Sequence, residues 1–183
     1  TLLNNNTFSS LFVLLCFLFV INGANLIDGF NGLLAINLII INSILAYINL
    51  ADGINEFSVV IIGQIIVLFS FLLFNFPSAK IFLGDSGSYF LGSLVALNVI
   101  ITNNLNPDYS SFFFCTLLFY LFFEVFFSFF RKIVQKKSPI HPDDKHLHML
   151  VFKKVSFIFG KDKGNYINSL IINLGYLSFV LPA

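Results

Sequence analysis

The sequence has 183 residues, of which 57% are apolar and only 10% are charged. Its mean hydropathy of +0.90 leaves too few polar groups for the surface of a soluble domain, which carries about 25% charged residues. Intrinsic disorder and a disulfide scaffold are excluded as well, because the chain is hydrophobic and its two Cys lie in separate apolar runs. We therefore predict an integral membrane protein.

Six apolar stretches are candidates for membrane spans, which need about 20 mainly apolar residues each. The stretches are apolar on every side, which favours helices over the alternating strands of a membrane barrel. We predict an all-α polytopic membrane bundle of about six transmembrane helices, forming a single transmembrane domain over residues 1–183. The expected spans are 8–21, 33–50, 57–76, 81–101, 112–130 and 166–181.

The positive charges are concentrated in one part of the chain. Nine of the ten basic residues lie between Arg131 and Lys163. The positive-inside rule therefore places the loop 131–165 in the cytoplasm. Counting back through the spans places segments 22–32 and 75–88 on the same side, and turns 51–56 and 104–110 outside. We expect the three polar segments to meet at the cytoplasmic face of the cell inner (plasma) membrane.

The first polar segment, 22–32, carries polar side chains at steps of three. Asn22, Asn25, Asp28 and Asn31 would share one side of a helical or 3₁₀ stretch. Polar residues at a membrane boundary usually line a cavity or bind a ligand. The alternative interpretation is a plain loop between two helices.

The second polar segment, 75–88, combines a basic residue with a carboxylate near two glycines. Ser86 and Ser88 are suited to cap the start of the next span, and a helix N-terminus favours phosphate groups. Asp85 suits a hard cation such as Mg²⁺, and Lys80 suits a phosphate. The alternative is a helix cap with Asp85 solvated at the interface.

The third polar segment, 138–148, holds all three His of the chain, His141, His146 and His148, with Lys145 among them. Zinc binding through His-x-His is disfavoured, because no Cys accompanies it and the surroundings are net basic. A loop that neutralises and orients phosphate groups fits better. The alternatives are a positive-inside anchor with incidental His and a site for anionic lipid head groups.

The three segments, in this order and at one face, resemble the polyprenyl-phosphate N-acetylhexosamine-1-phosphate transferases. This superfamily, glycosyltransferase family 4, also contains the phospho-N-acetylmuramoyl-pentapeptide transferases. The stretches that carry the resemblance are NGANLIDGFNGLLA, NFPSAKIFLGDSGSYFLG and HPDDKHLHM. The resemblance implies transfer of a sugar-1-phosphate, expected to be GlcNAc-1-phosphate, from a UDP-sugar to polyprenyl phosphate with release of UMP, the first membrane step of cell-envelope polysaccharide synthesis. Asn31 and Met149, where the muramoyl enzymes carry Asp and His, favour the GlcNAc-type branch.

The resemblance also implies roles for individual residues. Asp85 would bind Mg²⁺, or Mn²⁺ in its place. The implied catalytic residues are Asp85, Asn75, Asp28, His146 and His148, and the implied substrate-binding residues are Asn22, Asn25, Asn31, Lys80, Ser86, Lys145 and His141. The implied partners are a UDP-sugar, a polyprenyl phosphate lipid and the membrane, with no nucleic acid; a homodimer is left open.

The sequence departs from the family pattern in three respects. No Asp pair precedes Asn22, whereas the family has one upstream that positions or activates the lipid phosphate. Asp144 stands where many relatives have Arg, and the family has about ten spans. We therefore expect a C-terminal portion of a larger transferase. The competing hypotheses are an inactive fragment and a transporter that uses Asp28, Asp85 and Glu124 as pathway carboxylates.

Glu124 lies inside the expected fifth span, flanked by Phe. An intramembrane carboxylate is functional by default, but a structural hydrogen bond to Gln64 or Asn98 is an equally weighted alternative. Asn37, Asn42 and Gln64 are interpreted as interhelical hydrogen-bonding residues rather than as chemistry.

Overall fold

The computed structural model describes residues 6–136 and 145–182, and these residues are helical apart from short connections. The described ranges contain eight helices and no strand, which confirms the predicted all-α fold. The helices are α1 (Asn6–Ile27), α2 (Leu33–Ala51), α3 (Asn55–Asn75), α4 (Gly84–Leu105), α5 (Ser111–Leu117), α6 (Phe119–Val134), α7 (Leu147–Phe159) and α8 (Lys161–Val180).

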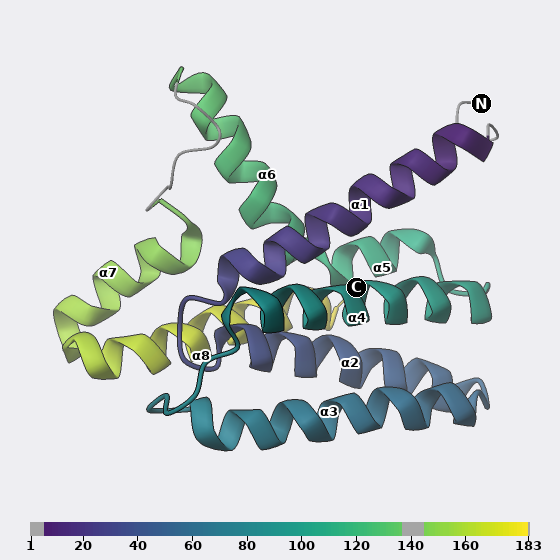
Figure 1. Cartoon of the computed structure of the whole chain (residues 1–183), viewed down its shortest axis with the longest axis horizontal. Coiled ribbons are helices and arrows are strands. Elements are labelled where there is room, and N and C mark those ends of the chain that lie inside the picture. Colours follow the sequence, from purple (N-terminus) through teal and green to yellow (C-terminus); the bar gives the residue numbers. More distant parts are fainter. Residues whose placement is uncertain (1–5, 137–144, 183) are drawn as a thin grey trace.

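The helices pack as neighbouring pairs around one core. α2 packs on α3, α1 packs on α4 and α6, and α7 packs on α8. In Figure 1, α2, α3 and α4 run side by side, α1 crosses them at an angle, and α7 and α8 form a hairpin at one end. The C-terminal end of α1 and the first turn of α4 lie at this same end, so the first two polar segments are brought close together.

Four helices are long and apolar enough to cross a membrane, namely Thr7–Ile27, α2, α3 and α4. A fifth span results if α5 and α6, which are bent by 70° at their junction, count as one broken span. The polytopic bundle is confirmed, but the expected count of about six is too high for the described residues. α8, the expected sixth span, is not among the candidates, because Asn165, Asn168 and Asn173 interrupt its apolar stretch.

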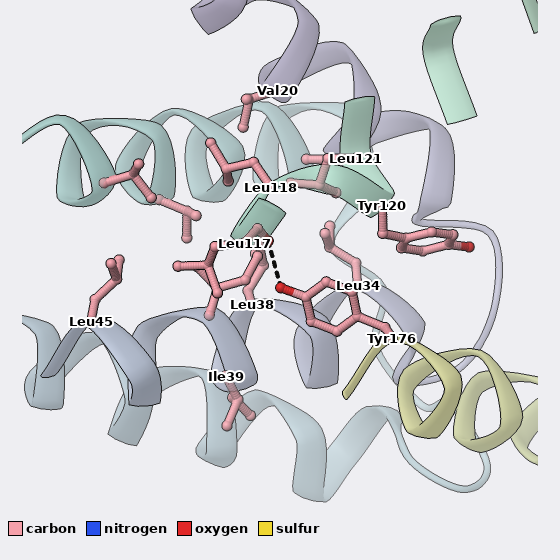
Figure 2. Close-up of a cluster of buried hydrophobic side chains, with 14 of the residues drawn as sticks. Val20, Leu34, Leu38, Ile39, Leu45, Leu117, Leu118, Tyr120, Leu121 and Tyr176 are labelled. Carbon is pink, nitrogen blue, oxygen red and sulfur yellow. Dashed lines mark hydrogen bonds between the residues drawn. The ribbon is translucent and has the colours of Figure 1, made fainter. Parts of the chain in front are cut away.

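The bend between α5 and α6 is stabilised from α8. A break in an apolar helix frees backbone groups that lipid cannot satisfy. The Tyr176 hydroxyl donates to the carbonyl of Leu117, the last residue of α5, at 2.5 Å (Figure 2). Leu34 and Leu38 of α2 and Leu121 of α6 surround this contact and are almost fully buried. The break is therefore built into the apolar core.

Amide side chains link the spans inside the bundle, as predicted. Asn98 Nδ2 of α4 donates to Asn42 Oδ1 at 3.0 Å and to Gln64 Oε1 at 2.7 Å, which joins α2, α3 and α4. Asn37 Nδ2 of α2 donates to Asn173 Oδ1 of α8 at 3.3 Å. The interpretation of Asn37, Asn42 and Gln64 as interhelical hydrogen-bonding residues is confirmed.

Two expected loops contain helix. α1 continues to Ile27, so it includes Asn22 and Asn25 of the expected loop 22–32. Asn22 is compatible with the helix because its side-chain amide donates to the Leu18 carbonyl one turn earlier, at 2.7 Å. The expected loop 131–165 contains the end of α6, the whole of α7 and the start of α8.

Candidate active site at the ends of α1 and α4

The end of α1 holds the carboxylate of Asp85 in the first turn of α4. Asn25 Nδ2 donates to Asp85 Oδ1 and to Ser88 Oγ, both at 3.0 Å. Ser88 Oγ in turn donates to the Asp85 backbone carbonyl at 3.1 Å. The first and second polar segments, 60 positions apart at this bond, therefore form one cluster.

Asp28 follows directly after α1 and lies beside Asp85. Its pKa is raised from 3.8 to about 6, first by burial and then by the negative charge of Asp85. A divalent cation between the two carboxylates would relieve this repulsion. The described residues contain no group of three or more His, Cys, Asp or Glu that could hold a metal on its own. A pair of carboxylates is a typical protein ligand set for Mg²⁺, because this ion takes its other ligands from water and substrate phosphates.

Asn75, the last residue of α3, fixes the segment that leads to Asp85. Its Oδ1 accepts from the backbone N–H of Gly32 at 2.6 Å, and its Nδ2 donates to the Ile81 carbonyl at 2.8 Å. Asn75 is 6% exposed, and Gly32 has a φ of 76°, which an L side chain rarely adopts. A buried amide at this position joins the start of α2 to the 76–83 connection.

Asn31 makes the corresponding link on the α1–α2 turn, residues 28–32. Its Nδ2 donates to the Pro77 carbonyl and its backbone N–H donates to Asn165 Oδ1, both at 2.8 Å. The turn is thus tied to the 76–83 connection on one side and to α8 on the other. No pattern in the sequence indicated Asn165, which contacts Asn31 across 134 positions.

His146 and His148 lie on the opposite side of the α1–α2 turn. Both are buried, and both contact Glu124 of α6 through Nδ1, at 3.2 Å and 3.0 Å respectively. The alternative of a structural hydrogen bond from Glu124 to Gln64 or Asn98 is therefore wrong, since those two amides pair with each other. The register between distant helices decides such a contact, and the local sequence does not encode it.

A cavity of about 640 Å³ is bordered by the turn and by residues of α1, α7 and α8. The ring of Phe30 meets the ring of His148 edge to face, with centroids 5.6 Å apart. This volume suits a ligand group that needs a few polar contacts among apolar walls. The cavity is lined by Leu26, Gly29, Phe30, His146, His148, Met149, Phe152, Lys153 and Asn165.

Seven of the predicted site residues fall into two groups. Asn25, Asp28, Asn31, Asn75 and Asp85 gather around the α1–α2 turn, and the two described His lie across it. Of the remaining predicted residues, Asn22 bonds its own helix, Lys80, Ser86 and Lys145 are exposed, and His141 lies outside the described residues.

The prediction that Ser86 and Ser88 cap the helix is wrong. α4 begins at Gly84, so both serines lie inside its first turns, and the N-cap residue Leu83 makes no side-chain capping bond. Ser88 instead connects Asn25 with the Asp85 backbone, because it is buried on the side of α4 that faces α1.

Asp28→Asn is expected to stabilise the protein at neutral pH in the presence of a chelator. The folded state raises the pKa of Asp28 to about 6, so it retains a proton that the unfolded chain has released, and stability falls as pH rises from 3.8 to 6. With solvent screening of this half-buried side chain, the expected gain is about 1–2 kcal/mol at pH 7 and little at about pH 4. Thermal unfolding at both pH values measures it.

The control for this prediction is Asp52→Asn, since Asp52 is exposed at the far end of α2. It is expected to leave the unfolding temperature unchanged at both pH values. A loss of stability in Asp28→Asn at pH 7 would contradict the placement of Asp28 beside Asp85.

Comparisons with known proteins place the chain among membrane transferases. The family model described as Glycosyl transferase family 4 matches residues 1–103. An undecaprenyl-phosphate alpha-N-acetylglucosaminyl 1-phosphate transferase of Thermotoga maritima is 34% identical over 147 residues, 79% of this chain and 43% of that protein. A phospho-N-acetylmuramoyl-pentapeptide-transferase of Leuconostoc mesenteroides is 43% identical over 82 residues, 44% of this chain and 25% of that protein. The chain thus spans less than half the length of these relatives, and no solved structure matches it.

Proposed function

Because the chain belongs to glycosyl transferase family 4, we propose that the protein transfers GlcNAc-1-phosphate from UDP-GlcNAc to polyprenyl phosphate and releases UMP. The name of the Thermotoga maritima relative, an undecaprenyl-phosphate alpha-N-acetylglucosaminyl 1-phosphate transferase, supports the choice of sugar and lipid. The observation that carries the proposal is the bond from Asn25 to Asp85, which joins two polar motifs at the ends of two adjacent membrane spans. A cytosolic nucleotide and a lipid phosphate can meet at such a boundary.

Asp85 and Asp28 are the residues that would hold Mg²⁺, or Mn²⁺ in its place. Bound there, the cation would supply charge neutralisation for the phosphates of both substrates. Asn25 orients the Asp85 carboxylate, and Asn75 and Asn31 hold the two backbone segments that carry the pair. Catalysis of phosphoryl transfer depends mainly on such positioning and on electrostatic stabilisation.

The cavity on the other side of the α1–α2 turn would receive part of the nucleotide sugar. His146, His148 and Asn165 offer hydrogen-bonding groups, and Lys153 brings a positive charge to the rim. We place this site at the cytoplasmic face of the inner membrane, because the basic residues of the chain cluster in 131–163. A transporter is not favoured, since the polar motifs gather at one end of the spans rather than at their middle.

The experiment that tests this function measures UMP. Membranes from cells that express the gene are supplied with UDP-GlcNAc, undecaprenyl phosphate and Mg²⁺, and UMP release is expected only when all three are present. UDP-GalNAc in place of UDP-GlcNAc tests the choice of sugar. Absence of UMP with every substrate present, from protein that is folded and membrane-inserted, would refute the proposed function.

A further inference from the structure

Glu124 is a buried carboxylate in the apolar helix α6. It lies in the Phe-rich stretch of α6 and is 1% exposed. Removing a carboxylate from water costs several kcal/mol unless its oxygens are fully hydrogen-bonded. The groups that bond its two oxygens therefore indicate its role.

Four short contacts of the carboxylate come from the start of α7, and the Tyr120 hydroxyl of α6 bonds it as well. Oε2 lies 3.2 Å from His146 Nδ1 and 3.3 Å from the Leu147 backbone nitrogen. Oε1 lies 3.0 Å from His148 Nδ1 and 3.4 Å from the His148 backbone nitrogen. The first N–H groups of a helix have no partner within it, and the N-cap residue His146 makes no side-chain capping bond. Glu124 therefore caps α7 from another helix.

The same contacts restrict the two imidazole rings. An ionised carboxylate can only accept hydrogen bonds, so Nδ1 of each ring must donate, and in a neutral ring Nε2 then keeps its lone pair. The rings are stacked at an interplanar angle of 2°, with centroids 5.4 Å apart. Both histidines are lining residues of the 640 Å³ cavity. One carboxylate thus sets the orientation and the tautomer of two cavity-lining histidines.

We propose that Glu124 is a positioning residue that holds His146 and His148 in the Nδ1–H form and leaves Nε2 of both rings for the ligand in the cavity. The identity of that ligand, the diphosphate or sugar of a nucleotide sugar, rests on the proposed function. The arrangement of carboxylate and rings stands on the contacts alone. An Nε2 lone pair accepts a hydrogen bond or a proton from a ligand hydroxyl, and an Nδ1 lone pair facing Glu124 would not.

Glu124→Gln separates this role from a merely structural one. The Gln side chain has the same shape but one accepting oxygen and one donating NH₂ group. Its NH₂ group then faces the Nδ1 of one ring. Two donors cannot hydrogen-bond to each other, so that ring must change to the Nε2–H form, in which Nδ1 accepts. Glu124→Asp keeps the charge and the accepting oxygens, so both rings are expected to stay in the Nδ1–H form.

The direct measurement is nitrogen NMR of the protein labelled with ¹⁵N-His and reconstituted in nanodiscs, with signals assigned through His146→Gln and His148→Gln. Wild type and Glu124→Asp are expected to show protonated Nδ1 on both rings, whereas Glu124→Gln shows protonated Nε2 on one of them. The matched control is Ser128→Ala, one turn further along α6 and also buried. It is expected to leave the ring signals unchanged.

Kinetics provide the second measurement. Loss of a carboxylate that orients a metal-ligating His typically costs about 10- to 100-fold, and we expect a fall of similar size in kcat/KM for Glu124→Gln with partial recovery in Glu124→Asp. Ring signals in folded Glu124→Gln identical to wild type would overturn the proposal, as would undiminished kcat/KM. The NMR result does not need turnover, so a wild-type protein that releases no UMP refutes the proposed function and leaves the positioning role testable by its spectrum.

Discussion

Asp85→Asn is expected to lower UMP release about 100- to 1,000-fold, the loss typical when a preorganised electrostatic group is removed from a phosphoryl or acyl transfer site. The change keeps an oxygen that accepts the Asn25 amide bond at 3.0 Å, so the end of α1 and the first turn of α4 should remain in contact. Only the negative charge that would hold Mg²⁺ is removed. Steady-state UMP release and Mn²⁺ affinity by paramagnetic resonance measure the two consequences.

The control for Asp85 is Asp108→Asn, in the connection between α4 and α5 at the other end of the spans. It removes the same charge from the chain and is expected to leave both UMP release and Mn²⁺ affinity at their wild-type values. Activity of Asp85→Asn comparable to wild type would show that the cation, if required, is held elsewhere.

Gly23→Ala is expected to destabilise the protein by about 1–3 kcal/mol, the usual cost of overpacking a core, and to lower activity with it. A Cβ at Gly23 would collide with the backbone carbonyl of Leu121 in α6, which is not a flexible side-chain end. α1 must then move away from α6, and it carries Asn25 and Asp28 at its end. Thermal unfolding and UMP release are measured on the same preparation.

Gly63→Ala is the matched control, because Gly63 is also a helical glycine in a membrane span but has no neighbouring atom within 4 Å of the added Cβ. Removing a flexible glycine from a helix interior favours folding by about 0.5–1 kcal/mol, so this variant should be as stable as wild type or more so. Equal unfolding temperatures for Gly23→Ala and Gly63→Ala would argue against the close packing of α1 on α6.

The sequence was sufficient to predict the spans that are uniformly apolar. α2, α3 and α4 follow the expected stretches closely, because length and hydrophobicity alone decide them. The last helix differs, since the apolar residues of α8 alternate with amides such as Asn168 and Asn173 that are buried against other helices. Hydrophobicity alone cannot distinguish a membrane span from a helix of mixed composition that packs on other helices, because both kinds of helix carry many apolar residues.

The candidate site was predictable as a set of motifs but not as a set of contacts. The polar spacing of 22–32 predicted that Asn25 and Asp28 share a side, which their common contact with Asp85 bears out. The partners of Glu124 and Asn165 depend on how helices far apart in the sequence meet. Such contacts leave no local pattern, so only the three-dimensional structure reveals them.

The short α1–α2 turn carries Asp28 on the side of α4 and Phe30 on the side of α7. Membrane helices tilt when the thickness of the bilayer changes, and a site spread over several of them would change shape as they tilt. Here a few backbone bonds fix the separation between the carboxylate side and the imidazole side. The turn therefore keeps the distance between Asp28 and Phe30 constant, and we expect this distance to be the same in thin and thick membranes.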